Sequence, residues 1–138
     1  MLFRKNKIVV FQSDSGLKDG AVSAMKRVAT GVSPDLKLFD CTHKIPAYNI
    51  WEAAYCLEQM VMYWPAGTVF VSVIDPGVAT NRKSVVLKTK SGHFIVTPDI
   101  SFCFHYAAGS DKPSKFVIII FPISSFAIKS TSAFCKIE

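Results

Sequence analysis

The sequence lacks long apolar runs, paired cysteines and a leader segment. Its longest apolar run, residues 116–128, is too short to cross a bilayer, and Pro122 and two serines interrupt it. The four cysteines form no CxxC pair, and no histidine stands at metal-ligand spacing from them. Residues 1–7 contain no apolar segment of the kind found in signal peptides. We therefore predict no membrane association, no metal site, free thiols and a cytoplasmic location.

Acidic residues are scarce, with ten against sixteen lysines and arginines, so the formal net charge is +6. The basic residues are scattered along the chain, and their only tight cluster is Arg4, Lys5 and Lys7. Scattered charge of this kind is typical of a solvated surface, so we predict no nucleic-acid partner. The alternative, a basic nucleic-acid-binding module, requires an affinity that falls steeply with added salt.

Half of the residues are hydrophobic and 19% are charged, which is typical of one globular domain with a core. Apolar runs expected of buried strands alternate with segments whose apolar residues recur at helical spacing. The predicted elements are strands at 8–11, 36–40 and 68–74, helices at 22–32 and 50–64, a hairpin of 84–88 with 94–96, and a strand at 116–121. This order predicts an α/β fold, with a mostly parallel sheet and helices on its faces.

Three aspartates stand at the ends of predicted strands: Asp14, Asp40 and Asp75. Ligands of open α/β sheets bind outside the carboxyl ends of the strands. A single Asp in such a place is more often a turn former or a helix N-cap. Three of them on adjacent strands favour a functional role for this edge of the sheet.

The segment from Asp75 to Arg82 is the most informative of these strand ends. Pro76 and Gly77 predict a sharp turn after the strand, which brings the Arg82 guanidinium back toward the Asp75 carboxylate. Such a pair can orient a water molecule, and the positive charge favours the deprotonated carboxylate. The alternative is a surface ion pair that only stabilises a loop.

A series of motifs resembles one enzyme family, the S-adenosyl-L-methionine (SAM) hydroxide adenosyltransferases, which are SAM hydrolases related to fluorinase and chlorinase. The matching segments, in order, are VVFQSDSGLKDG (9–20), MK (25–26), SPD (33–35), DCTHKIP (40–46), PAGTV (65–69), DPGV (75–78) with Arg82, and TPD (97–99). One such motif would be weak, but the ordered series is specific. Gln12, Ser13 and Ser15 depart from the family, which has Thr and an aromatic residue around the first Asp.

The resemblance implies that water or hydroxide attacks the ribose 5′ carbon of SAM and releases adenosine and L-methionine. By this resemblance Asp75 and Arg82 are catalytic, and an Asp at position 75 fits the hydroxide-using branch rather than the halide-using branch. Asp14 matches the acid that binds the ribose diol, Asp19 a position near the methionine end, and Tyr48 an aromatic residue bordering the sugar. SAM is a substrate here, so no cofactor is implied. The family's pocket lies between neighbouring subunits, usually of a trimer.

The match ends after Asp99, and that sets our expectations for the rest of the chain. The family's Phe-His-Gly-Arg-Asp segment, which carries a third catalytic residue, has no counterpart, and His93 and His105 lie in unrelated contexts. The C-terminal β domain of the family is also absent. We therefore interpret residues 7–99 as a partial N-terminal domain and residues 100–138 as an unassigned tail, possibly frameshifted. On this interpretation the chain is a truncated, inactive hydrolase for which a trimer is doubtful. The alternative is a non-catalytic ligand-binding or scaffold domain that retains the fold.

Overall fold

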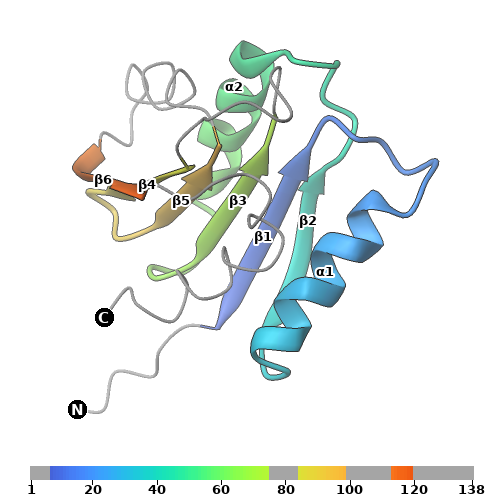
Figure 1. The fold of residues 1–138 in the computed structure, drawn as a ribbon. Coiled ribbons are helices and arrows are strands. Elements are labelled where there is room, and N and C mark those ends of the chain that lie inside the picture. The colour runs from blue at the N-terminus through green and yellow to red at the C-terminus, as the bar shows by residue number, and fades with distance from the viewer. Residues whose placement is uncertain (1–6, 75–83, 99–112, 120–138) are drawn as a thin grey trace.

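The computed structural model describes residues 7–74, 84–98 and 113–119, which form one six-stranded sheet with two helices (Figure 1). The strand order is β2-β1-β3-β5-β4-β6. The elements in chain order are β1 (Ile8–Ser13), α1 (Ala21–Val32), β2 (Lys37–Thr42), α2 (Ile50–Val61), β3 (Val69–Val73), β4 (Ser84–Thr89), β5 (Phe94–Thr97) and β6 (Pro113–Ile119). The predicted α/β class is confirmed.

The sheet is mostly parallel, as the alternating pattern predicts. The strands β2, β1, β3 and β5 run parallel to one another, whereas β4 pairs antiparallel with β5 and with β6. The predicted hairpin is therefore confirmed, and its turn places Gly92 at φ 88°, a backbone conformation that glycine adopts at little cost. The strand predicted at 116–121 is also present, and it lies at Pro113–Ile119.

The first helix ends at Val32, as predicted, whereas the second ends three residues earlier than predicted. Gly31 is a residue type that commonly ends a helix, but it lies inside α1. The apolar spacing predicts that the second helix continues to Trp64, but α2 ends at Val61, and the Trp64 backbone N–H donates to the Val61 carbonyl (3.2 Å). A helix commonly closes with such an i→i+3 bond, which satisfies one of its last carbonyl groups.

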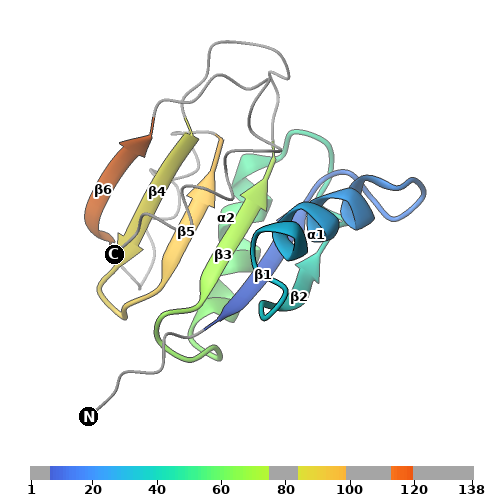
Figure 2. The ribbon, with the colours of Figure 1, turned by 60° about the horizontal axis from the view of Figure 1, so that its bottom comes forward.

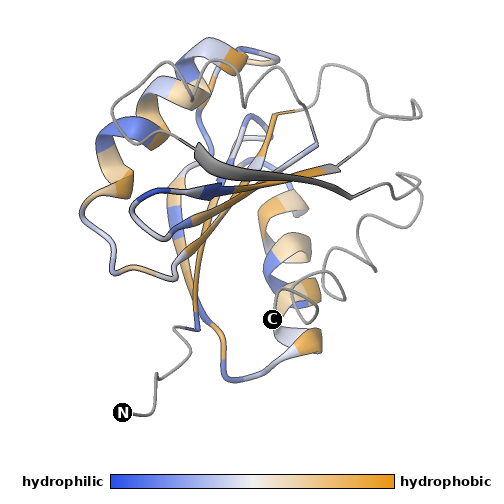
Figure 3. Ribbon diagram, turned by 90° about the vertical axis from the view of Figure 1, so that its left-hand side faces the viewer, coloured by the Kyte–Doolittle hydropathy of each residue, from blue (hydrophilic) through white to orange (hydrophobic). Residues whose placement is uncertain are grey.

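The two helices cover opposite faces of the sheet because the chain reverses direction at β1. It first moves from β1 to β2, and then returns past β1 to β3. Since both crossovers between parallel strands are expected to be right-handed, the reversal puts α1 on one face and α2 on the other. Figures 2 and 3 show this arrangement, with the sheet between the two helices. In such folds a ligand binds where the direction reverses, here at the carboxyl ends of β1 and β3.

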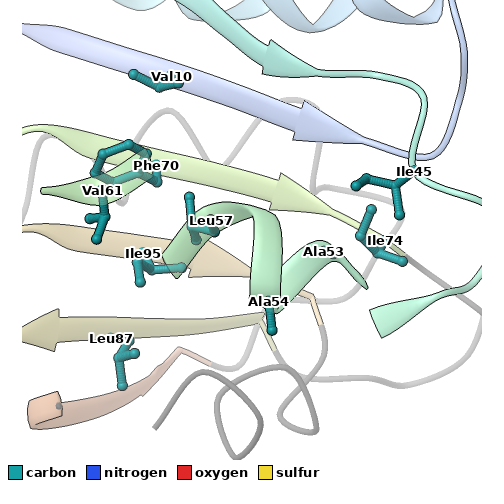
Figure 4. Packing of buried hydrophobic residues seen from close by; sticks show 10 residues of the cluster. All are labelled: Val10, Ile45, Ala53, Ala54, Leu57, Val61, Phe70, Ile74, Leu87 and Ile95. Atoms are coloured by element: carbon teal, nitrogen blue, oxygen red, sulfur yellow. The ribbon is translucent and has the colours of Figure 1, made fainter. Parts of the chain in front are cut away.

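Each face of the sheet has its own apolar cluster, because side chains alternate along a strand. Under α2, alternate strand residues such as Val10, Phe70 and Ile95 pack with the inner face of the helix (Figure 4). The buried members from the helix itself are Ala53, Ala54, Leu57 and Val61. On the other face, Val9, Phe11, Val71, Val86 and Val96 pack with Met25 and Ala29 of α1.

One buried polar contact joins the sheet to α2. Gln12 lies in β1, where its Nε2 donates to the Ala53 carbonyl (3.0 Å) and its Oε1 accepts from Ser72 Oγ (3.4 Å). A buried amide is tolerated when its donor and acceptor are both used. Gln12 thereby fixes the position of α2 over β1 and β3.

Neither helix of the described residues has the length and apolar character that crossing a bilayer requires.

The core under α2 gives a first prediction. Leu57 is 1% exposed, so Leu57→Ala is expected to lower the free energy of unfolding by about 2–5 kcal/mol through lost burial and a cavity. Urea unfolding followed by circular dichroism measures this. The matched control is Leu17→Ala, since Leu17 is 65% exposed and should lose little stability. Equal losses in the two variants would show that the core is elsewhere.

Candidate functional site

The carboxyl ends of β1 and β2 bring two loops together at one edge of the sheet (Figure 1). Gln12 of β1 pairs with Thr42 of β2, and Ser13 pairs with Val73 of β3. The chain leaves β1 through residues 14–20 and leaves β2 through residues 43–49. Since both strands end at the same level, these loops start side by side.

Three hydrogen bonds join the two loops. The imidazole Nδ1 of His43 and Ser13 Oγ lie 2.7 Å apart, and the Gly16 backbone N–H donates to the His43 carbonyl (2.8 Å). The Tyr48 backbone N–H donates to Asp14 Oδ2 (2.8 Å). The loop that carries Asp14 is therefore bonded to the other loop on both sides of Asp14 and through its carboxylate.

Asp14 and Tyr48, both predicted to bind substrate, lie together at this edge. Asp14 is half-buried, and within the described part of the chain its Oδ1 has no hydrogen-bond partner. Tyr48 has φ 63°, a left-handed conformation that is costly for a residue with a side chain. The bond from its N–H to Asp14 helps to hold this conformation, and the Tyr48 side chain remains 61% exposed. The Tyr48 backbone is thus bonded to a carboxylate that can accept further hydrogen bonds, and the Tyr48 side chain is open to solvent.

A chain of hydrogen bonds continues from Ser13 away from Asp14. His43 Nε2 lies 2.9 Å from Asp40 Oδ1, and Lys26 Nζ of α1 donates to Asp40 Oδ2 (2.5 Å). On the other side of Ser13, the hydroxyl of Ser15 lies 2.7 Å from Ser13 Oγ. This hydrogen-bonded network links both loops to α1. Its members, in the order of their bonds, are Ser15, Ser13, His43, Asp40 and Lys26.

Asp40 is the charged centre of this chain. Partial burial raises the pKa of its carboxyl group, but the hydrogen bonds with His43 and Lys26 and their charges act in the opposite direction and outweigh burial. The pKa of Asp40 is therefore lowered from its ordinary value of 3.8. The carboxylate is ionised near neutral pH, as an acceptor for both partners must be.

Asp19 has a structural contact. Its Oδ1 accepts from the backbone N–H of Ala21, the first residue of α1 (3.0 Å), and the side chain is exposed. A carboxylate at the start of a helix satisfies a free N–H group and interacts favourably with the helix dipole. Its predicted role near the methionine end of the ligand stays a prediction.

The predicted catalytic pair, Asp75 and Arg82, lies outside the described residues, which end at Ile74 and resume at Ser84. Residues 7–74, 84–98 and 113–119 contain no group of three or more His, Cys, Asp or Glu side chains that could hold a metal ion.

His43 is a residue of this edge to which the sequence patterns assign no role of its own. They identify Asp40 only as a strand end and Ser13 only as a departure from the family. The available signal is local, because a histidine three residues after an aspartate at a strand end can fold back to it. The contact with Ser13 has no sequence signal, since it joins residues 30 positions apart.

The sequence profile of the SAM hydroxide adenosyltransferase N-terminal domain matches residues 9–133. The chain belongs to this family. It is 40% identical over 96 residues to the (R)-S-adenosyl-L-methionine hydrolase of Methanocaldococcus jannaschii, covering 67% of this chain and 36% of that protein. It is 29% identical over 85 residues to a fluorinase of Actinoplanes sp., covering 62% of this chain and 28% of that one. The chain thus spans about a third of the length of these curated relatives.

Solved structures have the same fold. An uncharacterised conserved protein from Thermotoga maritima superposes with a TM-score of 0.74 at 31% identity, covering 80% of this chain and 41% of its own. A conserved hypothetical protein from Thermus thermophilus superposes with a TM-score of 0.75 at 29% identity, and the match covers 94% of this chain and 54% of that protein. The edge that carries Asp14 and Tyr48 is the candidate site of this family member.

The lowered pKa of Asp40 gives a second prediction. A carboxyl group whose pKa is lower in the folded than in the unfolded chain stabilises the fold above the unfolded pKa. That stabilisation begins to fall near the unfolded pKa, at about pH 4, and is lost as the pH falls through the lower folded value. Asp40→Asn should therefore lower the free energy of unfolding at pH 7. On acidification this variant should lose less stability than the wild type.

Urea unfolding at pH 7 and at acidic pH measures both effects. The matched control is Asp35→Asn, which removes a carboxylate bonded to Lys7 on the open surface and should change stability little. If Asp40→Asn lost as much stability on acidification as the wild type, the lowered pKa of Asp40 would be contradicted.

Proposed function

We propose that this chain provides the adenosyl-binding half of a SAM hydroxide adenosyltransferase, whose reaction converts SAM and water to adenosine and L-methionine. The observation that carries the proposal is the Asp14 carboxylate, held by the backbone N–H of the exposed residue Tyr48 at the carboxyl edge of the sheet in a member of this family. The relatives named as SAM hydrolases support the substrate class.

In this proposal Asp14 binds the ribose. A carboxylate has two oxygens and several lone pairs, so it can accept from two neighbouring hydroxyl groups at once. One oxygen also accepts from the Tyr48 N–H, and this bond orients the carboxylate before a ligand arrives. The exposed Tyr48 ring offers an apolar surface to the sugar.

The chemistry is assigned to Asp75 and Arg82, which orient and activate the attacking water. The sulfonium of SAM makes the neutral methionine sulfur a good leaving group, so the protein mainly has to place the water in line with the ribose 5′ carbon. Asp19 at the start of α1 is assigned to the methionine end of the ligand. No cofactor takes part.

We further propose that these 138 residues alone bind the ligand weakly and do not turn it over. They contain no counterpart of the family's Phe-His-Gly-Arg-Asp segment, and they cover about a third of the curated relatives. Binding energy from remote parts of a substrate positions its reacting carbon, so its loss lowers rate as well as affinity. Binding without turnover would make the chain a non-catalytic ligand-binding domain when studied by itself.

The ribose contact gives a third prediction. Asp14→Ala should weaken adenosine binding by about 1–3 kcal/mol, since the ribose hydroxyls lose their acceptor. Titration calorimetry measures the affinity of both proteins. The matched control is Asp35→Ala, which removes a surface carboxylate and should bind as the wild type does. Equal affinity in Asp14→Ala and the wild type would reject the ribose assignment.

Turnover gives a fourth prediction. The 138-residue chain incubated with SAM should release adenosine at the uncatalysed rate, as measured by chromatography. Turnover above background that disappears in Asp75→Ala or Arg82→Ala would confirm the catalytic pair. That result would also show that residues 100–138 supply the parts we consider missing.

A further inference from the structure

His43 is bonded to both ends of the short turn that carries Asp14. Its imidazole Nδ1 lies 2.7 Å from the Ser13 hydroxyl, and its carbonyl accepts from the Gly16 N–H (2.8 Å). Asp14 lies between these two attachment points, and the Gly16 backbone adopts φ 70°. A single residue of the second loop thus fixes the turn before and after the carboxylate.

The direction of the hydrogen bonds follows from Asp40. An ionised carboxylate only accepts, so His43 Nε2 carries the proton and donates to Asp40 Oδ1. In the neutral ring Nδ1 is then an acceptor, and the Ser13 hydroxyl donates to it. Ser13 Oγ in turn accepts from the Ser15 hydroxyl (2.7 Å) and more weakly from the Ser15 N–H (3.4 Å). With these directions, the Ser15 hydroxyl, the Ser13 hydroxyl and His43 Nε2 each donate to one acceptor.

The same three residue types form nucleophilic triads in other proteins, but the geometry here does not suit that role. Ser13 is 1% exposed and His43 is 4% exposed. A nucleophile must reach a substrate atom, whereas Ser13 Oγ is enclosed by His43 and Ser15. Asp14, which lies between these two serines, is half-buried and so can be reached more easily than Ser13.

We propose that His43 is a positioning residue, which acts through Ser13 and Gly16 to hold the Asp14 carboxylate in place for the adenosyl ligand. Asp40 and Lys26 in turn hold His43 in the tautomer that Ser13 needs. The last step, from Asp14 to the ligand, rests on the proposed function, but the effect of His43 on the turn does not.

The chain contains a matched control at the opposite edge of the sheet. Ser91 Oγ lies 2.6 Å from His93 Nδ1, and His93 Nε2 lies 2.9 Å from the Trp64 carbonyl. In this second serine–histidine pair His93 is buried and Ser91 is half-buried, and the pair precedes β5, so it lies at the amino end of the parallel strands. Ser91→Ala removes a bond of the same kind without touching the Asp14 turn.

The first experiment needs no ligand. Amide hydrogen exchange, followed by NMR, reports on the Gly16 and Tyr48 N–H groups. Ser13→Ala should speed exchange at both by about five- to tenfold, as expected for one lost hydrogen bond. Ser13→Thr keeps the hydroxyl and should exchange as the wild type does. Ser91→Ala should leave both amides unchanged.

Two substitutions of His43 separate its two bonds. Asn at position 43 can place an amide oxygen near the position of Nδ1, so His43→Asn keeps an acceptor for Ser13. Gln can place an amide nitrogen near the position of Nε2, so His43→Gln keeps the donor to Asp40 and loses the acceptor. Protection of Gly16 and Tyr48 should therefore survive in His43→Asn and fall in His43→Gln.

The second experiment measures adenosine affinity by titration calorimetry. Ser13→Ala and His43→Gln should bind about five- to tenfold more weakly, with Ser13→Thr, His43→Asn and Ser91→Ala close to the wild type. If the wild type binds no adenosine, the proposed function fails, while the exchange data still show whether His43 holds the turn. The inference is overturned if Ser13→Ala leaves Gly16 and Tyr48 protected. It is also overturned if Ser13→Ala speeds exchange equally at Gly16, at Tyr48 and throughout the core strand β1, because the substitution would then destabilise the whole fold rather than the turn.

Discussion

Because β1 lies between β2 and β3 and runs parallel to both, the loops after β1 and β2 must leave the sheet at the same edge. The contacts of the candidate site depend on this constraint. Ser13 meets His43, Gly16 meets the His43 carbonyl, and Asp14 meets Tyr48 only because the two strands end level with each other. The reversal of direction at β1 also sends α1 and α2 to opposite faces of the sheet (Figure 2).

The edge is polar where the middle of the sheet is apolar, and that difference has a cost. Ser13 and His43 are almost fully buried, and buried polar groups destabilise a fold unless they are hydrogen-bonded. The hydrogen-bonded network that joins Ser15, Ser13, His43, Asp40 and Lys26 meets this requirement. Throughout the described residues, no buried side-chain nitrogen or oxygen is without a hydrogen-bond partner. A fully bonded network of this kind keeps one geometry, which is what a binding carboxylate needs.

The sequence predicted the elements well and the contacts between them poorly. Apolar runs and helical spacing located β1, α1, β2, α2, β3 and the hairpin, because these patterns are local. Asp14 was found as a strand end, and Tyr48 from the family resemblance. Asp40 was expected at the end of its strand, but it lies within β2, which continues to Thr42, and the pairing register sets it opposite Phe11. Register depends on packing between distant segments, so residue spacing alone could not give it.

The proposed binding residue and the proposed catalytic pair belong to different segments of this chain. The Asp14 carboxylate is oriented by residues of the first two loops, all bonded before any ligand is present, so little ordering remains to be done on binding. Asp75 and Arg82 instead follow β3 in the sequence. The position of the Asp14 carboxylate therefore depends on the pairing of β1 with β2 and on the hydrogen bonds between the two loops that follow these strands.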